Sequence, residues 1–340
     1  MFPSQLMGHS RGLSCVYSTE PIDSILQKKE LLSVISFGKE CLSDKVQKHL
    51  FCGLQPLEDA NLKEVWCSDE AVSSGVDGQC FWSETDSQIM AAVCIDEKEY
   101  ADFRAVVNDA YQRILKLIAT RGYPHIIRVW NYMADITLGE GDKERYKQFC
   151  VGRYEAFVQY NYKLDQLPSA SALGYSGGGF MVYLLAAKRP GLHFENPMQL
   201  NAYHYPRKYG VQSPSFARAT LAEWGGGRQL FISGTASITG HESMHSESFC
   251  DQLTLICQNI DLLLKHVVKQ IDETQLAQMS ILKVYLRNKT DLGEAKKGIA
   301  KHFGDKIPVI FLQADLCRKE LLMEIDGHCS LGNSVNKAGR

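Results

Sequence analysis

The strongest constraint on the fold is an order of elements that occurs twice along the chain. Hydrophobic periodicity predicts strand, helix, strand, helix, strand and strand in the C-terminal third, over residues 228–234, 246–269, 281–287, 291–303, 308–314 and 320–325. The middle third is predicted to run strand, helix, strand, helix and strand, over residues 88–95, 98–119, 126–132, 143–160 and 179–187. The central strands are also similar, because IIRVWNYMADI matches ILKVYLRNKTDL. This repetition indicates duplicated units, so we expect an α/β fold of the α+β type.

The rest of the chain is less regular. Residues 1–85 contain short apolar runs without a comparable long helix, which fits either a degraded third copy or an embellishment. Residues 164–227 form a connector rich in Gly, Pro and aromatic residues. Such a long, weakly periodic segment inside a compact protein is more often functional than filler. The length of 340 residues, which by itself predicts two domains of about 150 residues, therefore fits two smaller units with additional segments.

Composition excludes several classes of protein. Hydrophobic residues make up 45% of the chain, and the formal net charge is -2. That charge disfavours a non-specific nucleic-acid binder, which is expected to be basic. No apolar run reaches the length of about eighteen residues that a membrane helix requires, and the N-terminal residues lack the apolar core of a secretory signal. The eleven cysteines include no C-x-x-C pair, so most are predicted to be reduced. We expect a cytoplasmic protein without nucleic-acid or membrane partners.

The segment HESMH at 241–245 matches the zinc-binding pattern H-E-x-x-H. In a zinc site of that kind the two histidines lie within a helix. Here the segment follows Gly240 and precedes a helix that is expected to start near Ser246, and no third ligand stands at a convincing spacing. A turn in which these side chains cap the following helix is therefore the favoured interpretation, and we expect no metal.

The helix predicted at 143–160 contains an unusual arginine. Steps of three and four residues place Arg153 on one face with Tyr146, Phe149, Cys150 and Phe157. A buried guanidinium is unfavourable unless an anion accepts its hydrogen bonds. The anion is either a structural carboxylate, such as Asp135 or one near Glu155, or a ligand held by two hydrogen bonds. The adjacent Gly152 lowers helix propensity, which a close approach by another backbone or by a ligand would explain.

Glu324 is the second residue that points to chemistry. In the strand predicted at 320–325, alternation places Glu324 on one face with Leu322, among apolar neighbours. A carboxyl group in such surroundings has a raised pKa and acts as a proton donor near neutral pH. The alternative is a glutamate on an edge strand that faces water. Cys317 and Arg318 precede it by one short loop.

A set of long motifs resembles the chorismatase family. They are RVWNYMADI (128–136), ERYKQFCVGRYEAF (144–157), PSASALGY (168–175), AYHYPRKYG (202–210), SPSFARA (213–219), FISGTASITGHES (231–243) and CRKELLMEIDG (317–327). They span residues 128–327. The C-terminal unit also resembles the RidA/YjgF fold, so the chain looks like fused, diverged copies of that fold. The implied domains are 1–215, with a RidA-like unit at about 86–190, then 216–330 and a tail at 331–340.

The resemblance implies a substrate and a reaction. The substrate is chorismate, a small dianion with an enolpyruvyl ether, which loses pyruvate without metal or organic cofactor. Glu324 matches the glutamate that is thought to protonate the methylene carbon of the ether. A cysteine seven residues before that glutamate, here Cys317, together with Gly234, resembles members that form 3-hydroxybenzoate, some of which also release 4-hydroxybenzoate. The alternatives are a hydrolytic chorismatase that gives 3,4-dihydroxycyclohexa-1,5-diene carboxylate, and a RidA-like ligand-binding protein or imine deaminase.

The resemblance also implies residues that bind the substrate. Two carboxylates demand cationic partners, and the matching motifs contain Arg145, Arg153 and Arg218. Hydroxyl groups and ring walls are expected from Tyr203, Tyr205 and Tyr209. The site is expected at the junction of the fused units, lined by the middle helix and the last strand. Because fused copies supply that junction within one chain, we expect a monomer or a small homo-oligomer.

Overall fold

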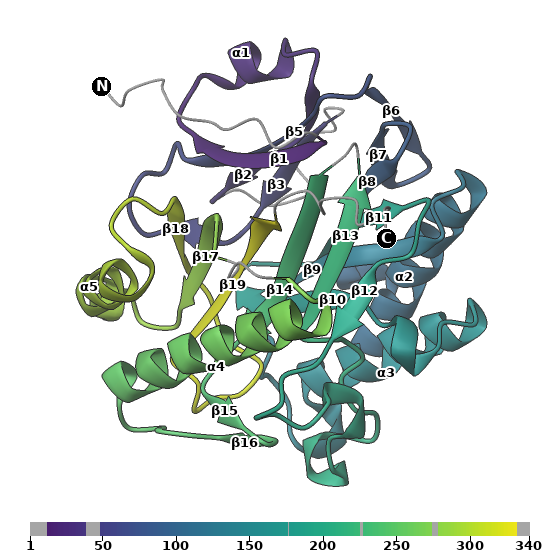
Figure 1. Cartoon of the computed structure of the whole chain (residues 1–340). Coiled ribbons are helices and arrows are strands. Elements are labelled where there is room, and N and C mark those ends of the chain that lie inside the picture. The colour runs from purple at the N-terminus through teal and green to yellow at the C-terminus, as the bar shows by residue number, and fades with distance from the viewer. Residues whose placement is uncertain (1–11, 39–47, 176, 225–226, 274–277, 332–340) are drawn as a thin grey trace, which may run out of the picture.

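The computed structural model describes residues 12–38, 48–175, 177–224, 227–273 and 278–331. Three larger β-sheets, one small hairpin and five α-helices make up this part of the chain (Figure 1). Within these ranges, no helix is both long and apolar enough to cross a membrane. The predicted α/β fold class is confirmed.

The middle sheet has the strand order β10-β9-β11-β8-β7-β6. Its strands are β6 (Ser73–Asp77), β7 (Cys80–Glu84), β8 (Gln88–Ile95), β9 (His125–Ala134), β10 (Ser169–Tyr175) and β11 (Phe180–Ala187). β9 and β10 are parallel, and β11 is antiparallel to both β9 and β8. Helix α2 (Phe103–Thr120) connects β8 to β9, and α3 (Arg145–Gln159) connects β9 to β10.

The C-terminal sheet has the order β12-β13-β14-β19-β17-β18-β4. Its strands are β12 (Leu192–Phe194), β13 (Ala219–Trp224), β14 (Gly227–Thr235), β17 (Ile281–Leu286), β18 (Val309–Gln313), β19 (Met323–Leu331) and β4 (Gln55–Pro56). Helices α4 (Phe249–Gln270) and α5 (Leu292–Phe303) connect β14 to β17 and β17 to β18. The order β18-β17-β19-β14 repeats β10-β9-β11-β8, again with one parallel pair followed by antiparallel neighbours.

The N-terminal sheet shows the same arrangement a third time. Its strands are β1 (Leu13–Ser18), β2 (Leu31–Phe37), β3 (His49–Cys52) and β5 (Lys63–Ser68), with α1 (Ile22–Leu26) between β1 and β2. In the order β3-β2-β5-β1, β2 and β3 are parallel and the other pairs are antiparallel. This topology favours the degraded third copy over the embellishment.

Two predictions about elements are wrong. Residues 164–227 are not an irregular connector, because β10, β12 and β13 lie within them in addition to β11, which was predicted. β10 completes the middle unit, which therefore has the same six-element order as the C-terminal unit. The last strand runs over Met323–Leu331 rather than 320–325, and a loop precedes it. The division into domains at residues 215 and 330 stays a prediction, and the expected tail beyond Leu331 lies outside the described residues.

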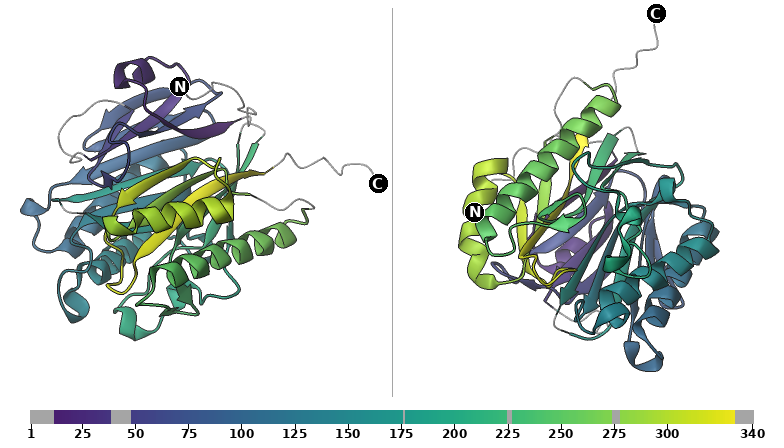
Figure 2. Two further views of the ribbon diagram at one scale, coloured as in Figure 1. Left: turned by 90° about the vertical axis from the view of Figure 1, so that its left-hand side faces the viewer. Right: turned by 90° about the horizontal axis from the view of Figure 1, so that it is seen from below.

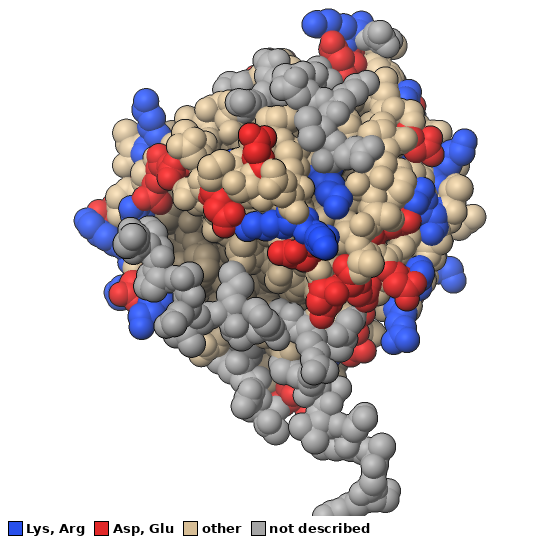
Figure 3. Space-filling view, turned by 90° about the horizontal axis from the view of Figure 1, so that it is seen from above, with Lys and Arg blue, Asp and Glu red and all other residues tan. Residues whose placement is uncertain are grey.

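The three sheets face a common core, and their helices lie outside it (Figure 2). One aromatic side chain from each sheet meets at the centre: the ring of Trp66 lies 5.9 Å from that of Trp130 and 6.3 Å from that of Phe231. On the face seen from above in Figure 3, basic and acidic side chains are interspersed. Nine of the described cysteines are free, as predicted for most of them, whereas Cys94 is disulfide-bonded.

Candidate active site

A cavity of about 330 Å³ lies where the middle sheet meets the C-terminal sheet. One wall comes from α3 and β10, and the other from β14, the start of β19 and the loop before it. The sheets meet because β10 lies against the neighbouring unit: the amides of Ser169 and Ala170 donate to Thr220 Oγ1 and Ser233 Oγ, both at 2.8 Å. The cavity is therefore built at the junction of two repeated units.

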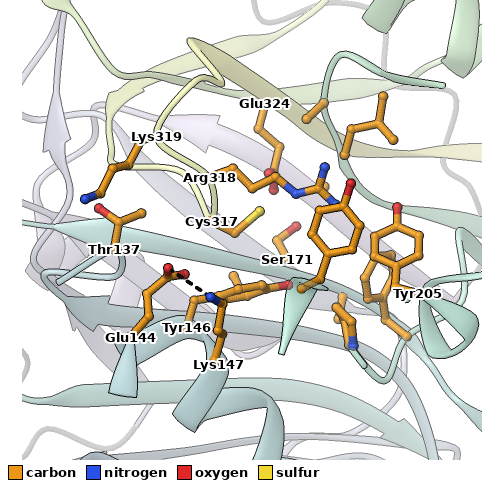
Figure 4. Close-up of a pocket in the computed structure, with 18 of the residues that line it drawn as sticks. Thr137, Glu144, Tyr146, Lys147, Ser171, Tyr205, Cys317, Arg318, Lys319 and Glu324 are labelled. Atoms are coloured by element: carbon orange, nitrogen blue, oxygen red, sulfur yellow. Dashed lines mark ion pairs between the residues drawn. The ribbon is translucent and has the colours of Figure 1, made fainter. Parts of the chain in front are cut away.

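Glu324 points into this cavity from β19 (Figure 4). Its neighbours Met323 and Ile325 face the other way, into the core beneath α4 and α5, as the alternation of a strand requires. Glu324 is 5% exposed, and no described residue forms a hydrogen bond with its carboxyl group. Burial and the negative charge of Asp326 raise the pKa of Glu324 to about 8. The carboxyl group is therefore mostly protonated at neutral pH.

A buried polar network lies beside Glu324. Asp326 Oδ2 accepts hydrogen bonds from Ser171 Oγ at 2.6 Å and from the Tyr285 hydroxyl at 2.9 Å. It also forms an ion pair with Arg128 Nη2 at 2.8 Å. Ser171 lines the cavity, and Figure 4 shows its hydroxyl turned toward the same space as Glu324. The network thus joins the floor of the cavity to the middle sheet.

Two arginines in the cavity wall are available to an anion. Arg153 is 2% and Arg218 5% exposed, and among the described residues neither has a carboxylate within ion-pair distance. The Nε atoms of both are buried, with no hydrogen-bond partner in the part of the chain that the structure describes. Burial raises the pKa of the nearby Glu195 to about 7, against the effect of Arg218, so this carboxyl neutralises Arg218 only in part. Buried guanidinium groups without an anion predict an anionic ligand.

The structure also explains the residues around Arg153. Phe149, Cys150 and Phe157 are buried on the same face of α3, as the helical spacing predicts. Glu155, near which a structural partner was expected, instead pairs with Arg104. A Cβ atom on Gly152 would clash with the carbonyl oxygen of Arg104 in α2. The close backbone approach predicted for this glycine is therefore confirmed.

Cys317 and Gly234 shape the space around the carboxyl group of Glu324. A Cβ atom on Gly234 would clash with Glu324 Oε1 and would lie 3.1 Å from Ser171 Oγ, so only glycine leaves room for this carboxyl position. Burial, with a contribution from Glu324, raises the pKa of Cys317 to about 12. The thiol is therefore neutral, and as a weak hydrogen-bonding group it makes this part of the wall effectively apolar.

The rim of the cavity is basic and aromatic. Tyr205 and Tyr209 line it, and the guanidinium of Arg318 lies 4.1 Å from the centroid of the Tyr209 ring. Arg318 Nη1 also donates to the His241 carbonyl and to Ser243 Oγ, both at 3.0 Å. These bonds attach the small hairpin of β15 (Ile238–Thr239) and β16 (Glu242–Ser243) to the rim.

The HESMH segment lies on this hairpin and the turn after it, not in a helix. The capping role predicted for it belongs to Ser248, whose hydroxyl accepts a hydrogen bond from the amide of Asp251 at 3.3 Å. Throughout the described ranges, no group of three His, Cys, Asp or Glu side chains is placed to hold a metal ion.

Two of the expected binding residues are not brought to the cavity. The guanidinium of Arg145 forms two hydrogen bonds with Glu97, at 2.6 and 2.8 Å, and a third with the carbonyl of Ala134. Tyr203 lies outside the cavity wall, with its hydroxyl 2.6 Å from the side-chain amide of Asn201. Both residues are in the expected motifs, but neighbouring packing directs their side chains elsewhere.

Sequence reasoning missed Ser171 and Arg318 as candidate site residues. Both stand inside motifs that the sequence singles out, PSASALGY and CRKELLMEIDG. Arg318 directly follows Cys317, so its place next to an expected site residue was the available signal. Ser171 has no such signal, because a serine between two alanines in a strand is chemically unremarkable until its partners Asp326 and Arg128 are placed around it.

Comparison with known proteins agrees with this site. The family described as "Chorismatase FkbO/Hyg5-like, N-terminal" matches residues 64–186. A 3-hydroxybenzoate synthase of Streptomyces hygroscopicus is 35% identical over 277 residues, which cover 78% of this chain and 80% of that protein. A chorismatase of the same organism is 35% identical over 280 residues, covering 79% and 80% of the two chains.

A solved structure agrees on the fold. A crystal structure of a chorismatase superposes with a TM-score of 0.85 at 27% identity, covering 94% of this chain and 98% of that one. A YjgF/YER057c/UK114 family member from Mycobacterium tuberculosis covers 34% of this chain and 86% of its own, at 18% identity with a TM-score of 0.26. The two Streptomyces relatives at 35% identity, matched over 78% and 79% of this chain, place it in the chorismatase family of enzymes.

Proposed function

We propose that this enzyme releases pyruvate from chorismate, with Glu324 as the general acid. The observation that carries the proposal is one arrangement: a buried carboxyl group faces a cavity whose walls hold two buried arginines, and within the described ranges neither the carboxyl group has a hydrogen-bond partner nor the arginines a carboxylate partner. A dianionic enol ether fits both features. Arg153 and Arg218 bind its carboxylates, and Glu324 donates to its methylene carbon. General-acid catalysis of this kind contributes about 10²–10⁴-fold to the rate.

The proposed reaction balances without water. The O–H bond of Glu324 breaks as a C–H bond forms at the methylene carbon, which leaves an oxocarbenium ion. The substrate's own hydroxyl oxygen then attacks the ring carbon that carries the ether. The electrons of the breaking C–O bond go to the ether oxygen, which becomes the keto oxygen of pyruvate. The hydroxyl proton returns to Glu324, and the ring fragment rearranges to the aromatic hydroxybenzoate.

The aromatic product, 3-hydroxybenzoate, is the finer part of the proposal. The relatives do not decide it, because the two at 35% identity are named for different activities. Support comes from the wall next to Glu324, where the neutral thiol of Cys317 offers a water molecule little to hold it in place. An attacking water needs such orientation, so the internal route is favoured over hydrolysis.

The test is incubation of the purified protein with chorismate in water enriched in oxygen-18. We expect pyruvate, detected by coupled reduction to lactate, and 3-hydroxybenzoate without heavy oxygen on its ring, detected by mass spectrometry. Absence of pyruvate would refute the activity, whereas a non-aromatic diol, with or without heavy oxygen, would refute the product alone. Glu324→Gln is expected to bind chorismate and to lose at least about 10²-fold in turnover.

A further inference from the structure

We propose that Asp326 is a positioning residue for this reaction: its buried carboxylate, two residues beyond Glu324 on the same face of β19, acts together with the burial of Glu324 to hold Glu324 in the acid form. This inference rests on the proposed role of Glu324 as proton donor. Asp326 does not line the cavity, so it acts on the substrate only through its neighbour.

The carboxyl groups of Asp326 and Glu324 have different surroundings. Asp326 is 2% exposed. Its Oδ2 accepts hydrogen bonds from Ser171 and Tyr285, at 2.6 and 2.9 Å, and forms an ion pair with Arg128 at 2.8 Å. Glu324 has no donor among the described residues. One face of one strand thus carries two acids in different surroundings: Asp326 lies next to a cation and two hydroxyl donors, and Glu324 lies next to neither.

The donors of Asp326 are themselves held in place. Arg128 is fully buried in β9, and its Nη2 also donates to Ser171 Oγ at 2.5 Å. The Tyr285 hydroxyl lies 3.1 Å from that of Tyr132. These residues come from β9, β10 and β17, so the position of the negative charge is fixed by the middle and C-terminal sheets together.

Other charged and titratable groups also act on Glu324 from the neighbouring elements. The positive charges of Arg128 on β9 and Arg218 before β13 lower the pKa of Glu324, and their effects are smaller than that of Asp326. Cys317 is neutral because its pKa is raised to about 12. His328, further along β19, has a pKa lowered to about 4 by burial and is also neutral. After the burial of Glu324 itself, Asp326 is therefore the charged group with the largest effect on the pKa of Glu324.

The negative charge of Asp326 also affects the step after proton donation, in which Glu324 regains a proton. Once Glu324 has given its proton to the substrate, two negative carboxylates lie on one buried face of β19. Their repulsion makes Glu324 a stronger base than an isolated glutamate. It therefore takes up the hydroxyl proton released in the internal route, which closes the proton cycle within the site.

The experiment is an infrared titration of the protonated carboxyl band of Glu324, assigned as the band that disappears in Glu324→Gln. In Asp326→Asn we expect the titration midpoint to fall by about 1–2 pH units, and the alkaline limb of kcat/KM to fall with it. The KM for chorismate should change little, because Asp326 does not touch the substrate. Asp261→Asn, in α4, where the carboxyl group contacts His302 of α5 and does not line the cavity, is the control and should leave the midpoint unchanged.

A double variant tests the same effect without leaving a buried charge unpaired, which could prevent folding. Asp326→Asn leaves Arg128 buried without its partner, so the double variant Arg128→Gln/Asp326→Asn removes both charges. Because Asp326 has the larger effect on Glu324, the midpoint should still fall, by less than in the single variant. An unchanged or raised midpoint in the folded variants would overturn the inference. The titration needs no turnover, so failure of the wild-type protein to release pyruvate would refute the proposed function alone.

Discussion

Arg145 and Arg153 stand eight residues apart on the same helix and differ in what their guanidinium groups meet. Arg145 is paired with Glu97, whereas Arg153 lines the cavity with its Nε unpaired. We expect Arg153→Met to raise the KM for chorismate about ten- to a hundredfold, since a hydrogen bond to a charged group contributes about 1.5–3 kcal/mol. Steady-state kinetics of pyruvate release measure this change.

Arg145→Met is the matched control for that variant. It removes a guanidinium from the same helix, but one that is bonded to Glu97 and to the carbonyl of Ala134. We expect its unfolding midpoint in urea to fall while the KM stays near the wild-type value. If the KM rose as much in Arg145→Met as in Arg153→Met, the claim that only Arg153 of the two binds the substrate would be wrong.

The burial of Arg153 could be predicted because it follows from helical spacing alone. The partner of Arg145 could not, because Glu97 is 48 residues away in sequence and no local pattern connects them. The same limit applies to Arg128. Its position in an apolar strand is visible in the sequence, but its partner Asp326 lies on another sheet.

Gly152 shows how one position sets the distance between two helices. Adding a Cβ atom there would clash with the Arg104 carbonyl oxygen of α2, and backbone cannot move aside as a flexible side chain can. We expect Gly152→Ala to lower the free energy of unfolding by about 1–3 kcal/mol, the usual effect of overpacking. Urea denaturation followed by circular dichroism is the measurement.

Gly293 in α5 is the control, because nothing lies within 4 Å of a Cβ atom added there. Gly293→Ala should raise the free energy of unfolding by up to about 1 kcal/mol through helix propensity. If both substitutions changed stability in the same direction and by the same amount, the close packing of α2 against α3 would not be what requires glycine at 152.

Elements with strong periodicity were predicted well, and elements that depend on tertiary contacts were not. β8 and the helices α4 and α5 follow their apolar patterns. β10 has the sequence SASALGY, with few residues of high strand propensity, and is held by its parallel pairing with β9. β19 begins late because Arg287 bonds the carbonyls of Leu321 and Arg318, at 2.8 and 2.9 Å, and so keeps the preceding segment in a loop.

On the scale of the whole molecule, three copies of one topology carry one candidate site. Glu324 pairs with Tyr285 on the central strand of its sheet, Glu64 with Ile35 and Tyr183 with Trp130. These three positions correspond in the repeated topology. Only Glu324 faces the cavity between the middle and C-terminal sheets. Tyr183 is an aromatic core residue, and Glu64 is buried and bonded to other side chains.

Glu64 occupies the corresponding position in the N-terminal sheet, but its carboxyl group is bonded to other side chains. Its Oε2 forms an ion pair with Lys283 Nζ at 2.5 Å, and its Oε1 accepts a hydrogen bond from Trp66 Nε1 at 2.7 Å. Lys283 is itself 3% exposed, and its ammonium group lies 3.1 Å from the Tyr183 hydroxyl. The pair thus joins the N-terminal sheet to the C-terminal sheet and contacts the middle one, so its role is to hold the three units together.

Lys283→Met therefore tests the whole assembly. The substitution leaves Glu64 as an unpaired buried charge, and we expect it to lower the free energy of unfolding by about 3–5 kcal/mol. Adding Glu64→Gln removes that charge and keeps an acceptor for Trp66, so the double variant should recover most of the loss. Urea midpoints measure both effects. Equal instability of the single and double variants would contradict this, because the loss would then come from packing rather than charge. At urea concentrations below its unfolding midpoint, the double variant should still release pyruvate, because neither Lys283 nor Glu64 lines the cavity that holds Glu324.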